Sequence, residues 1–365
     1  MNITIVAGAR PNFMKIAPII HAIEKAKISG KEIQYRLVHT GQHYDSNMSG
    51  SFFKQLNIPT PHINLNSGSG SQAEITSSIM IEFEKDLIKH ASDLVIVVGD
   101  VTSTMACAIV AQKLKIKVAH VEAGIRSYDW SMPEEINRLV TDSITNYFFT
   151  TSITANQNLI NEGVNKKNIF FVGNTMIDTL LSNRKRFCPP DFWDKLNLKP
   201  KKYIVLTLHR PSNVDEKKHL KEMIMKIVES TLDYQIIFPM HPRTKQVYDT
   251  LDISDSRLNI VSSLGYLEFN FLVENSLAVI TDSGGITEET TVLGIPCITL
   301  RQTTERPETV FQGTNELIGT DPNSIPKIMK KLFSGNWKKG VIPNKWDGKT
   351  SQRIIEKLLT LDIQK

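Results

Sequence analysis

Leu94-Val95-Ile96-Val97-Val98 is an uninterrupted run of five apolar residues, and Gly99-Asp100 follows it directly. Such a run is typical of a central strand that helices cover on both faces of a parallel sheet. A helical pattern over 103–114 comes next in the chain. The order of strand, turn and helix predicts a βα unit.

Units of this kind recur along the chain in two series. The first series of strands is predicted at 2–7, 34–39, 94–98, 117–121, 147–150 and 169–172, and the second at 203–206, 235–239, 259–262, 278–281 and 296–300. Helical periodicity is found between strands at 73–90, 103–114, 218–230, 266–275 and 284–293. Two such series predict an α/β protein with two Rossmann-like domains that face each other across a cleft.

The length and a break in the pattern predict where these domains lie. Domains usually contain about 100–200 residues, so a chain of 365 residues is expected to hold two. Cys188-Pro189-Pro190 marks a connection within 174–200, because consecutive prolines stop a helix. We expect an N-terminal domain over 1–172, a C-terminal domain over 173–349, and a last helix at about 350–365 that packs back on the first domain.

The composition argues against several classes of protein. The chain has 43 basic and 38 acidic residues, and the net charge of +5 is scattered, so no nucleic-acid partner is predicted. The three cysteines form no CxxC pair or Cys/His cluster, which argues against a disulfide framework or a metal site. No apolar run approaches the roughly 20 residues of a membrane span, and the first residues enter a strand at once, so a cytoplasmic protein is predicted.

Basic residues and glycines follow several predicted strands, as a phosphate site requires. Arg10 and Lys15 come after the strand at 2–7, where a guanidinium fork and an ammonium suit a diphosphate. Ser283-Gly284-Gly285 opens a helix whose free N–H groups and positive dipole end also suit a phosphate. The chain has no Walker loop and no GxGxxG fingerprint, so neither ATP nor NAD is implied. Arg10 and Lys15 taken alone could equally be solvated side chains beside a turn.

Carboxylates and histidines also follow predicted strands. Asp100 and Glu122 each stand directly after one, and Glu134 or Glu135 opens a helix behind Pro133. Each could serve only as a cap or as a complement to a helix dipole. The topology nevertheless brings the ends of parallel strands together, which favours a catalytic cluster. His209 and His241 stand after two later strands, and either could be structural.

Together these segments resemble the non-hydrolysing UDP-N-acetylglucosamine 2-epimerase family, whose members have the two-domain GT-B fold. The matching motifs cover nearly the whole chain in order: GARP at 8–11 with Lys15, TGQH at 40–43, GD at 99–100, HVEAGIRS at 120–127, PEEINR at 133–138, GNT at 173–175, HRPSN at 209–213, TDSGGITEE at 281–289 and TTERPE at 303–308.

The resemblance implies a role for each matching position. The catalytic carboxylates would be Asp100, Glu122 and Glu134, and His209 would lie beside the diphosphate and assist departure of UDP. Glu289 would hold the ribose, and 264–269, including Phe269, would pack against uracil. The residues implied to hold the diphosphate are Arg10, Lys15, Ser283, Gly284, Gly285 and Arg306.

The implied reaction explains why these groups are needed. The C2 proton of an N-acetylhexosamine is not next to a carbonyl, so the family eliminates UDP first and forms a 2-acetamidoglucal. Cations and N–H donors stabilise the departing phosphate, and carboxylates act as base and acid. No metal or redox cofactor takes part. The family also implies a homodimer and a role in bacterial surface polysaccharide synthesis.

Some family members bind a second UDP-sugar as an allosteric activator, and Gln42, His43 and His241 match part of that second site. The sequence also departs from the family at Asn12 and Thr287, and its 127–133 loop is about two residues shorter than in enterobacterial members. A modified sugar, such as a 2,3-diacetamido uronic acid, therefore stays open as substrate. Two different functions also stay open, that of a GT-B glycosyltransferase and that of a non-catalytic regulator which binds a nucleotide sugar.

Overall fold

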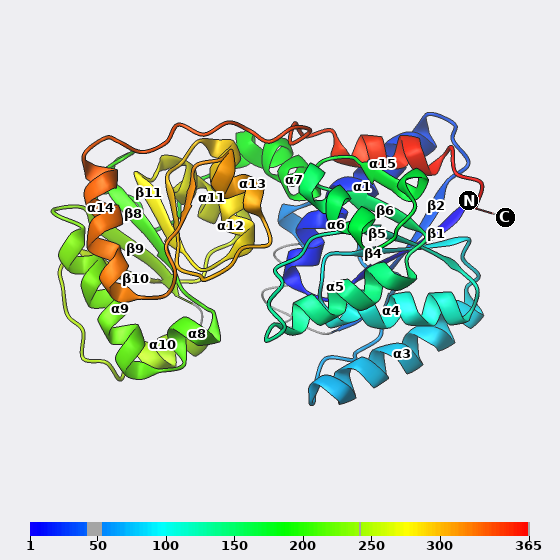
Figure 1. Ribbon diagram of the computed structural model, residues 1–365, viewed down its shortest axis with the longest axis horizontal. Coiled ribbons are helices and arrows are strands. Elements are labelled where there is room, and N and C mark those ends of the chain that lie inside the picture. The colour runs from blue at the N-terminus through cyan, green and yellow to red at the C-terminus, as the bar shows by residue number, and fades with distance from the viewer. Residues whose placement is uncertain (42–52, 241, 364–365) are drawn as a thin grey trace. The chain divides into compact units, whose positions relative to one another are not determined.

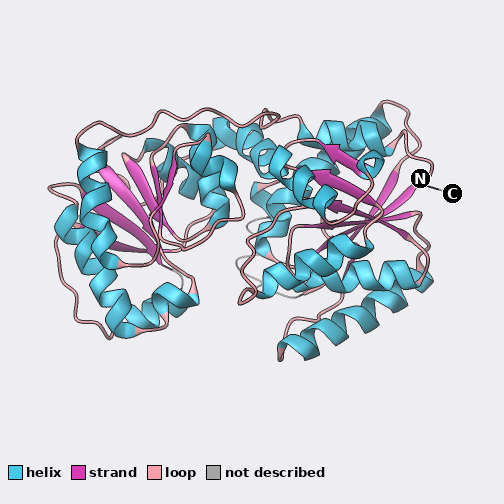
Figure 2. Cartoon of the chain, in the orientation of Figure 1, coloured by secondary structure: helices cyan, strands magenta, loops and turns pink. Residues whose placement is uncertain are grey.

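The computed structural model describes residues 1–41, 53–240 and 242–363. The chain forms two α/β units, of which the first contains Met1–Ser182 together with Asn344–Lys365 and the second contains Asn183–Pro343. Each unit has one sheet with helices on both faces (Figures 1 and 2). The predicted α/β class with two Rossmann-like units is thus confirmed.

The sheet of unit 1 has seven parallel strands in the order β3-β2-β1-β4-β5-β6-β7. Its strands are β1 (Asn2–Ala7), β2 (Gln34–His39), β3 (Ile63–Asn64), β4 (Leu94–Val98), β5 (Lys117–Val121), β6 (Tyr147–Thr150) and β7 (Ile169–Phe171). Its helices are α1 (Arg10–Ile28), α3 (Gln72–Lys89), α4 (Thr102–Lys113), α5 (Pro133–Ile144), α6 (Ile153–Asn161), α7 (Thr175–Asn183) and α15 (Thr350–Leu358).

The sheet of unit 2 has six parallel strands in the corresponding order, β10-β9-β8-β11-β12-β13. Its strands are β8 (Tyr203–Thr207), β9 (Gln235–Met240), β10 (Leu258–Ser262), β11 (Ala278–Thr281), β12 (Cys297–Thr299) and β13 (Asn315–Leu317). Its helices are α8 (Pro211–Val214), α9 (Lys217–Ser230), α10 (Pro242–Tyr248), α11 (Tyr266–Asn275), α12 (Gly284–Leu293), α13 (Pro307–Phe311) and α14 (Ile325–Phe333).

The apolar strands form the centre of each core. All five residues of β4 are buried, and Val95 and Val97 pack in one cluster with Ile79 and Phe83 of α3. In β8, alternate residues contribute to two clusters, since side chains of a strand point to opposite faces. A strand covered on both faces must be apolar at every position, which is why these runs could be identified in the sequence.

The predicted strands are confirmed to within two residues, and β3 and β13 are additional short strands. The stretch at 174–200, expected as a connection, contains helix α7. The structure groups α7 up to Ser182 with unit 1, whereas the expected change of domain was at 172–173. In the described part of the chain, no helix combines the length and apolar character needed to cross a membrane.

The last residues of the chain return to unit 1, where α15 packs against α1 (Figure 1). Trp346 is buried there and donates from Nε1 to the carbonyl of Thr151, at 3.0 Å. Asp178 of α7 accepts from the N–H groups of Thr350 and Ser351, at 3.0 and 2.7 Å, and so satisfies the first turn of α15. A Cβ on Gly173 would lie 2.2 Å from the carbonyl oxygen of Lys345, so this approach requires glycine.

Candidate active site

Several of the predicted site residues, among them Lys15, Asp100, His209 and Ser283, come after the strands at which the order of each sheet reverses. In unit 1 these strands are β1 and β4, which are neighbours although they are not consecutive in the chain. In unit 2 the corresponding neighbours are β8 and β11. Loops at such a switch point leave the sheet in opposite directions and open a crevice beyond the strand ends.

Asp100 follows β4 and is held by helix α5. Arg138 donates from Nε and Nη2 to Asp100 Oδ2, at 3.0 and 2.6 Å. The Arg138 side chain is 2% exposed and that of Asp100 is 30% exposed, so the carboxylate reaches solvent while its partner does not. The amide of Asn137 donates to the Asp100 carbonyl at 2.8 Å. Both the backbone and the side chain of Asp100 are therefore bound to one helix.

Glu122 follows β5 in a left-handed backbone conformation with φ of 71°. Its Oε2 lies 2.5 Å from Nζ of Lys15, which α1 carries, and both side chains are buried. Asn12 accepts from the N–H groups of Gly8 and Ala9, and its own amide donates to the Val98 carbonyl. Asn12 thus ties the turn after β1 to the end of β4, close to Lys15.

The two consecutive glutamates at the start of α5 have different surroundings. Glu135 is buried and accepts from the Ser127 and Tyr128 N–H groups, both at 2.9 Å, and from Arg138 Nη1 at 2.5 Å. Burial opposes the lowering of its pKa, but these donors outweigh burial and the pKa lies below its ordinary value. Glu134 is half-buried, and within the described residues it makes no hydrogen bond or ion pair. The Glu135 carboxylate is therefore engaged by neighbouring donors, whereas that of Glu134, the predicted catalytic residue, is engaged by none in the described part of the chain.

His209 of unit 2 is oriented by a buried aspartate. Asp282 Oδ1 lies 2.7 Å from His209 Nδ1, and the His209 side chain is 53% exposed while that of Asp282 is inaccessible. Asp282 also accepts from the N–H of Arg210 at 2.9 Å and from the Asn213 amide at 3.1 Å. Burial raises the Asp282 pKa, but the bonds from His209, Arg210 and Asn213 outweigh it and lower the pKa overall.

Helix α12 begins at Gly284 with Ser283 as its N-cap, beside a buried guanidinium. Arg301 donates from Nη2 to Glu305 at 2.6 Å. Among the described residues its buried Nη1 has no hydrogen-bond partner, and it lies 3.5 Å from where a Cβ on Gly284 would be. A helix N-terminus next to an unsatisfied guanidinium nitrogen is suited to an anionic oxygen.

The other predicted nucleotide-binding residues lie near α12. Glu289 is buried and accepts from the Tyr266 hydroxyl at 3.0 Å, and burial together with Glu289 raises the Tyr266 pKa. Arg306 forms an ion pair with Glu288. Phe269 packs at the edge of the core cluster around Leu272 and is partly buried.

Comparison with known proteins identifies the family. A family profile described as UDP-N-acetylglucosamine 2-epimerase matches residues 26–359. The UDP-N-acetylglucosamine 2-epimerase of Methanocaldococcus jannaschii is 43% identical, over 97% of this chain and 98% of that protein. The chain belongs to the UDP-N-acetylglucosamine 2-epimerase family.

A solved structure and a second relative are also similar to this chain over most of its length. The crystal structure of Methanocaldococcus jannaschii UDP-GlcNAc 2-epimerase in complex with UDP-GlcNAc and UDP has a TM-score of 0.87 at 43% identity, over 98% of this chain and 99% of that one. A UDP-2,3-diacetamido-2,3-dideoxy-D-glucuronate 2-epimerase of Pseudomonas aeruginosa is 37% identical, over 89% of this chain and 90% of that protein. The family resemblance, the GT-B type of fold and the enzyme class are confirmed.

The structure of this epimerase groups the predicted site residues by unit. Lys15, Asp100, Glu122 and Glu134 lie in unit 1, and His209, Phe269, Ser283, Gly284, Gly285, Glu289 and Arg306 lie in unit 2. The predicted allosteric residues Gln42, His43 and His241 fall outside the described residues, as does the side chain of Arg10. The roles of all these residues remain predictions.

Three residues that contact predicted site residues were given no role of their own from the sequence, although the matching motifs and the stretch 264–269 contain them. The partners of these residues are remote in the sequence. They are His209 for Asp282, Asp100 for Arg138 and Glu289 for Tyr266, at separations of 73, 38 and 23 positions. Only the pair Glu135 and Arg138 left a local signal, since opposite charges three positions apart lie on one face of a helix.

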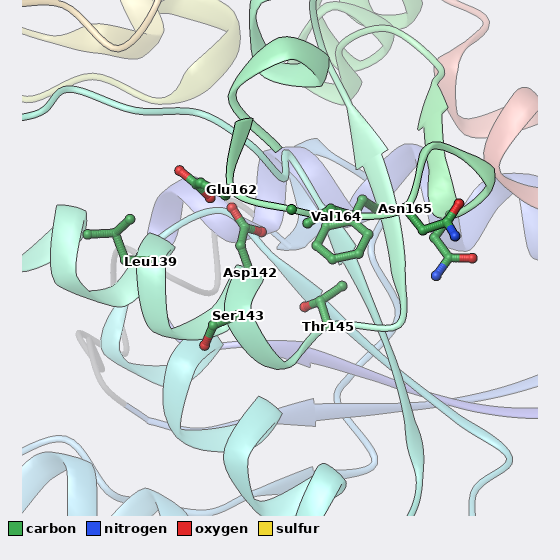
Figure 3. A pocket seen from close by; sticks show the side chains of 10 residues that line it. Leu139, Asp142, Ser143, Thr145, Glu162, Val164 and Asn165 are labelled. Atoms are coloured by element: carbon green, nitrogen blue, oxygen red, sulfur yellow. The ribbon is translucent and has the colours of Figure 1, made fainter. Parts of the chain in front are cut away.

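A cavity of about 500 Å³ in unit 1 of the epimerase lies apart from these residues (Figure 3). Leu139, Asp142 and Ser143 of α5 line one part of it, and Glu162 and Asn165, which follow α6, line another. None of the predicted substrate-binding residues is among those that line it.

Proposed function

We propose that the protein interconverts UDP-GlcNAc and UDP-ManNAc without hydrolysing them. The observation that carries this proposal is the arrangement of Asp100, Glu122 and Glu134 after β4, after β5 and at the start of α5, three neighbouring elements of unit 1. The family membership and the solved complex of a 43% identical relative with UDP-GlcNAc and UDP support the choice of substrate.

The reaction proceeds by elimination and re-addition. One carboxylate takes the C2 proton, the C2–H electrons form a C1–C2 double bond, and the C1–O bond breaks with its electrons on UDP. UDP then adds back to C1 while C2 receives a proton on the opposite face, so no water is consumed. Two carboxylates can serve as base and acid, because no single group reaches both faces of the sugar.

The leaving diphosphate requires positive charge and N–H donors. In unit 2 these are the N-terminus of α12 at Ser283, Gly284 and Gly285, together with Arg306, and His209 assists departure of UDP. The family resemblance also assigns the diphosphate to Arg10 and Lys15, the ribose to Glu289 and the uracil ring to Phe269. Lys15 already lies 2.5 Å from Glu122, so its charge serves the carboxylate as well as the phosphate.

The decisive experiment is incubation with UDP-GlcNAc in D₂O, followed by proton NMR of the C2 position. We expect deuterium at C2 and the manno epimer, with the total amount of UDP-sugar unchanged. Free ManNAc would indicate hydrolysis, and turnover only after addition of a sugar acceptor would indicate a glycosyltransferase. If the protein left UDP-GlcNAc unchanged but exchanged C2 hydrogen in UDP-2,3-diacetamido-2,3-dideoxy-D-glucuronate, its substrate would instead be the one named for the 37% identical relative.

Asp100→Asn tests the carboxylates directly. The amide cannot take a proton, so we expect turnover to fall by at least about 10³-fold, within the range of general acid–base catalysis. The affinity for UDP, measured by calorimetry, should stay within about threefold because the diphosphate donors of unit 2 are unchanged. Full activity of this variant would remove Asp100 from the mechanism.

We further infer that the protein acts in the cytoplasm as a homodimer and supplies a precursor of surface polysaccharides. Cys107 and Cys297 are buried free thiols, which suits a reducing compartment. Ile81 and Ile88 of α3 are 53% and 71% exposed, and a spacing of seven places both on one face of the helix. A contact with a second copy would cover these two exposed apolar side chains, which flank the exposed charges of Glu84 and Lys85 on the same face.

A further inference from the structure

The buried residues of helix α5 are all polar, namely Glu135, Asn137, Arg138, Thr141 and Asp142. Their hydrogen bonds reach the segments that follow β4 and β5, which carry Asp100 and Glu122. Burying charged groups is costly unless they are paired and hydrogen-bonded. A helix that merely covered the sheet would carry apolar residues here, so these side chains have another role.

Arg138 connects two of these segments. Its Nε and Nη2 bind Asp100 Oδ2, and its Nη1 binds Glu135 Oε2 at 2.5 Å. A guanidinium has a fixed planar fork, so the orientation set by one carboxylate determines where the other must lie. The position of Asp100 is thus defined by a buried group on a rigid element.

Glu135 connects Arg138 to the loop after β5. Its carboxylate accepts from the N–H groups of Ser127 and Tyr128 and from the Ser127 hydroxyl, at 2.9, 2.9 and 3.0 Å. Tyr128 has a left-handed backbone with φ of 57°, a conformation that needs such support. The chain of contacts therefore runs from the 127–128 backbone through Glu135 and Arg138 to Asp100.

We propose that Arg138 is a positioning residue for Asp100 and that Glu135 couples Asp100 to the 127–132 loop. The inference rests on the proposed function, in which Asp100 handles the C2 proton. The coupling means that the acid–base group and this loop move as one body. A change in either partner should then affect the chemical step and leave binding of UDP largely unchanged.

The test compares Arg138→Gln and Arg138→Lys with the wild-type protein. Arg138→Gln should lower kcat about 100-fold, the cost of a displaced catalytic group, while KM and the calorimetric Kd for UDP stay within about threefold. Arg138→Lys keeps a charge but loses the fork, so its kcat should lie between the two. Glu135→Gln should also lower kcat, and combining it with Arg138→Gln should cost less than the sum of the two effects.

Arg36→Gln is the matched control, because Arg36 binds Asp86 of unit 1 through Nε and Nη2 at 3.2 and 2.6 Å. It should lower the melting temperature without a selective loss of kcat. The inference would be overturned if Arg138→Gln had the kcat of the wild type. It would also be overturned if Arg36→Gln had the same melting temperature as Arg138→Gln and lost as much kcat. Were the wild-type protein itself to exchange no C2 hydrogen, the proposed function would fail instead. Carbon-13 NMR titration of the Asp100 carboxyl would then test the positioning role by itself. Arg138→Gln removes the positive charge beside this carboxylate, so its titration midpoint must move to higher pH.

Discussion

At the scale of single residues, Arg301 and Asp282 each place a charged group in a buried position, where a single hydrogen bond has a large effect on binding or stability. Arg301 Nη1 is buried beside the start of α12 and has no hydrogen-bond partner among the described residues. Leaving a charged donor unsatisfied costs more than one hydrogen bond gains. A phosphate oxygen at this place would satisfy the donor and bind more tightly as a result.

Arg301→Gln should therefore weaken the binding of UDP about 10- to 100-fold, since hydrogen bonds to charged groups contribute about 1.5–3 kcal/mol. Uridine, which lacks the diphosphate, should bind the variant and the wild type alike. Calorimetry with both ligands measures the difference, and Arg257→Gln, in a partly buried pair with Asp255, is the control. Equal losses for UDP and uridine would show that the substitution only disturbs the fold.

Asp282 gives the protein a defined sensitivity to acid. Its pKa in the folded state lies below the ordinary value of 3.8, so its bonds stabilise the fold above that value and are lost as the pH falls through the lowered pKa. The melting temperature of Asp282→Asn should be lower than that of the wild type at neutral pH, and the gap should narrow as the pH falls below about 4 and through the lowered pKa. Calorimetric scans at a series of pH values check this, and a constant gap would contradict it. Asp249→Asn, in the exposed pair with Lys245, should show no such trend.

At the scale of elements, the ends of helices are completed by side chains from remote parts of the chain. The first turn of α15 is satisfied by Asp178, and the loop after β8 is held by Asp282. The sequence alone predicted the last helix, at about 350–365, and the strand at 203–206, but neither partner. Local patterns report periodicity and turns, whereas a pairing across 172 positions has no local trace.

The same distinction explains what else could be predicted. Strands such as β4 were identified because burial on both faces requires an unbroken apolar run. Strand β13, Asn315–Leu317, has only three residues with no β-branched side chain, so it left no such signal. The catalytic candidates Asp100 and Glu122 follow strands and were found by position, but the identification of Arg138 as the partner of Asp100 required the fold.

Trp346→Ala tests the docking of the C-terminal segment on unit 1. Removing a buried tryptophan costs about 3–5 kcal/mol, so we expect unit 1 to melt at a lower temperature and α15 to become accessible to proteases. Trp337→Ala is the matched control, because its indole also donates to a backbone carbonyl, that of Thr314, but in unit 2. If Trp346→Ala lowered the melting temperature of unit 2 instead, the assignment of residues 344–363 to unit 1 would be contradicted.

At the scale of the whole molecule, the proposed dimer can be tested through α3. Replacing both Ile81 and Ile88 by Glu places two charges on the proposed contact, and we expect a monomer by light scattering at micromolar concentration. Leu232→Glu, at an exposed leucine of unit 2, should leave the mass unchanged. If the wild-type protein were monomeric over the same concentration range, the proposed homodimer would be wrong.

The return of residues 344–363 to unit 1 also has a consequence for biosynthesis. During translation, unit 1 lacks Trp346 and α15 until the ribosome has passed the whole of unit 2. Unit 2 is contiguous and can complete its own sheet while the nascent chain is still attached. Unit 1 is thus begun before unit 2 but completed after it, and premature termination just after Pro343 would yield a whole unit 2 beside an incomplete unit 1.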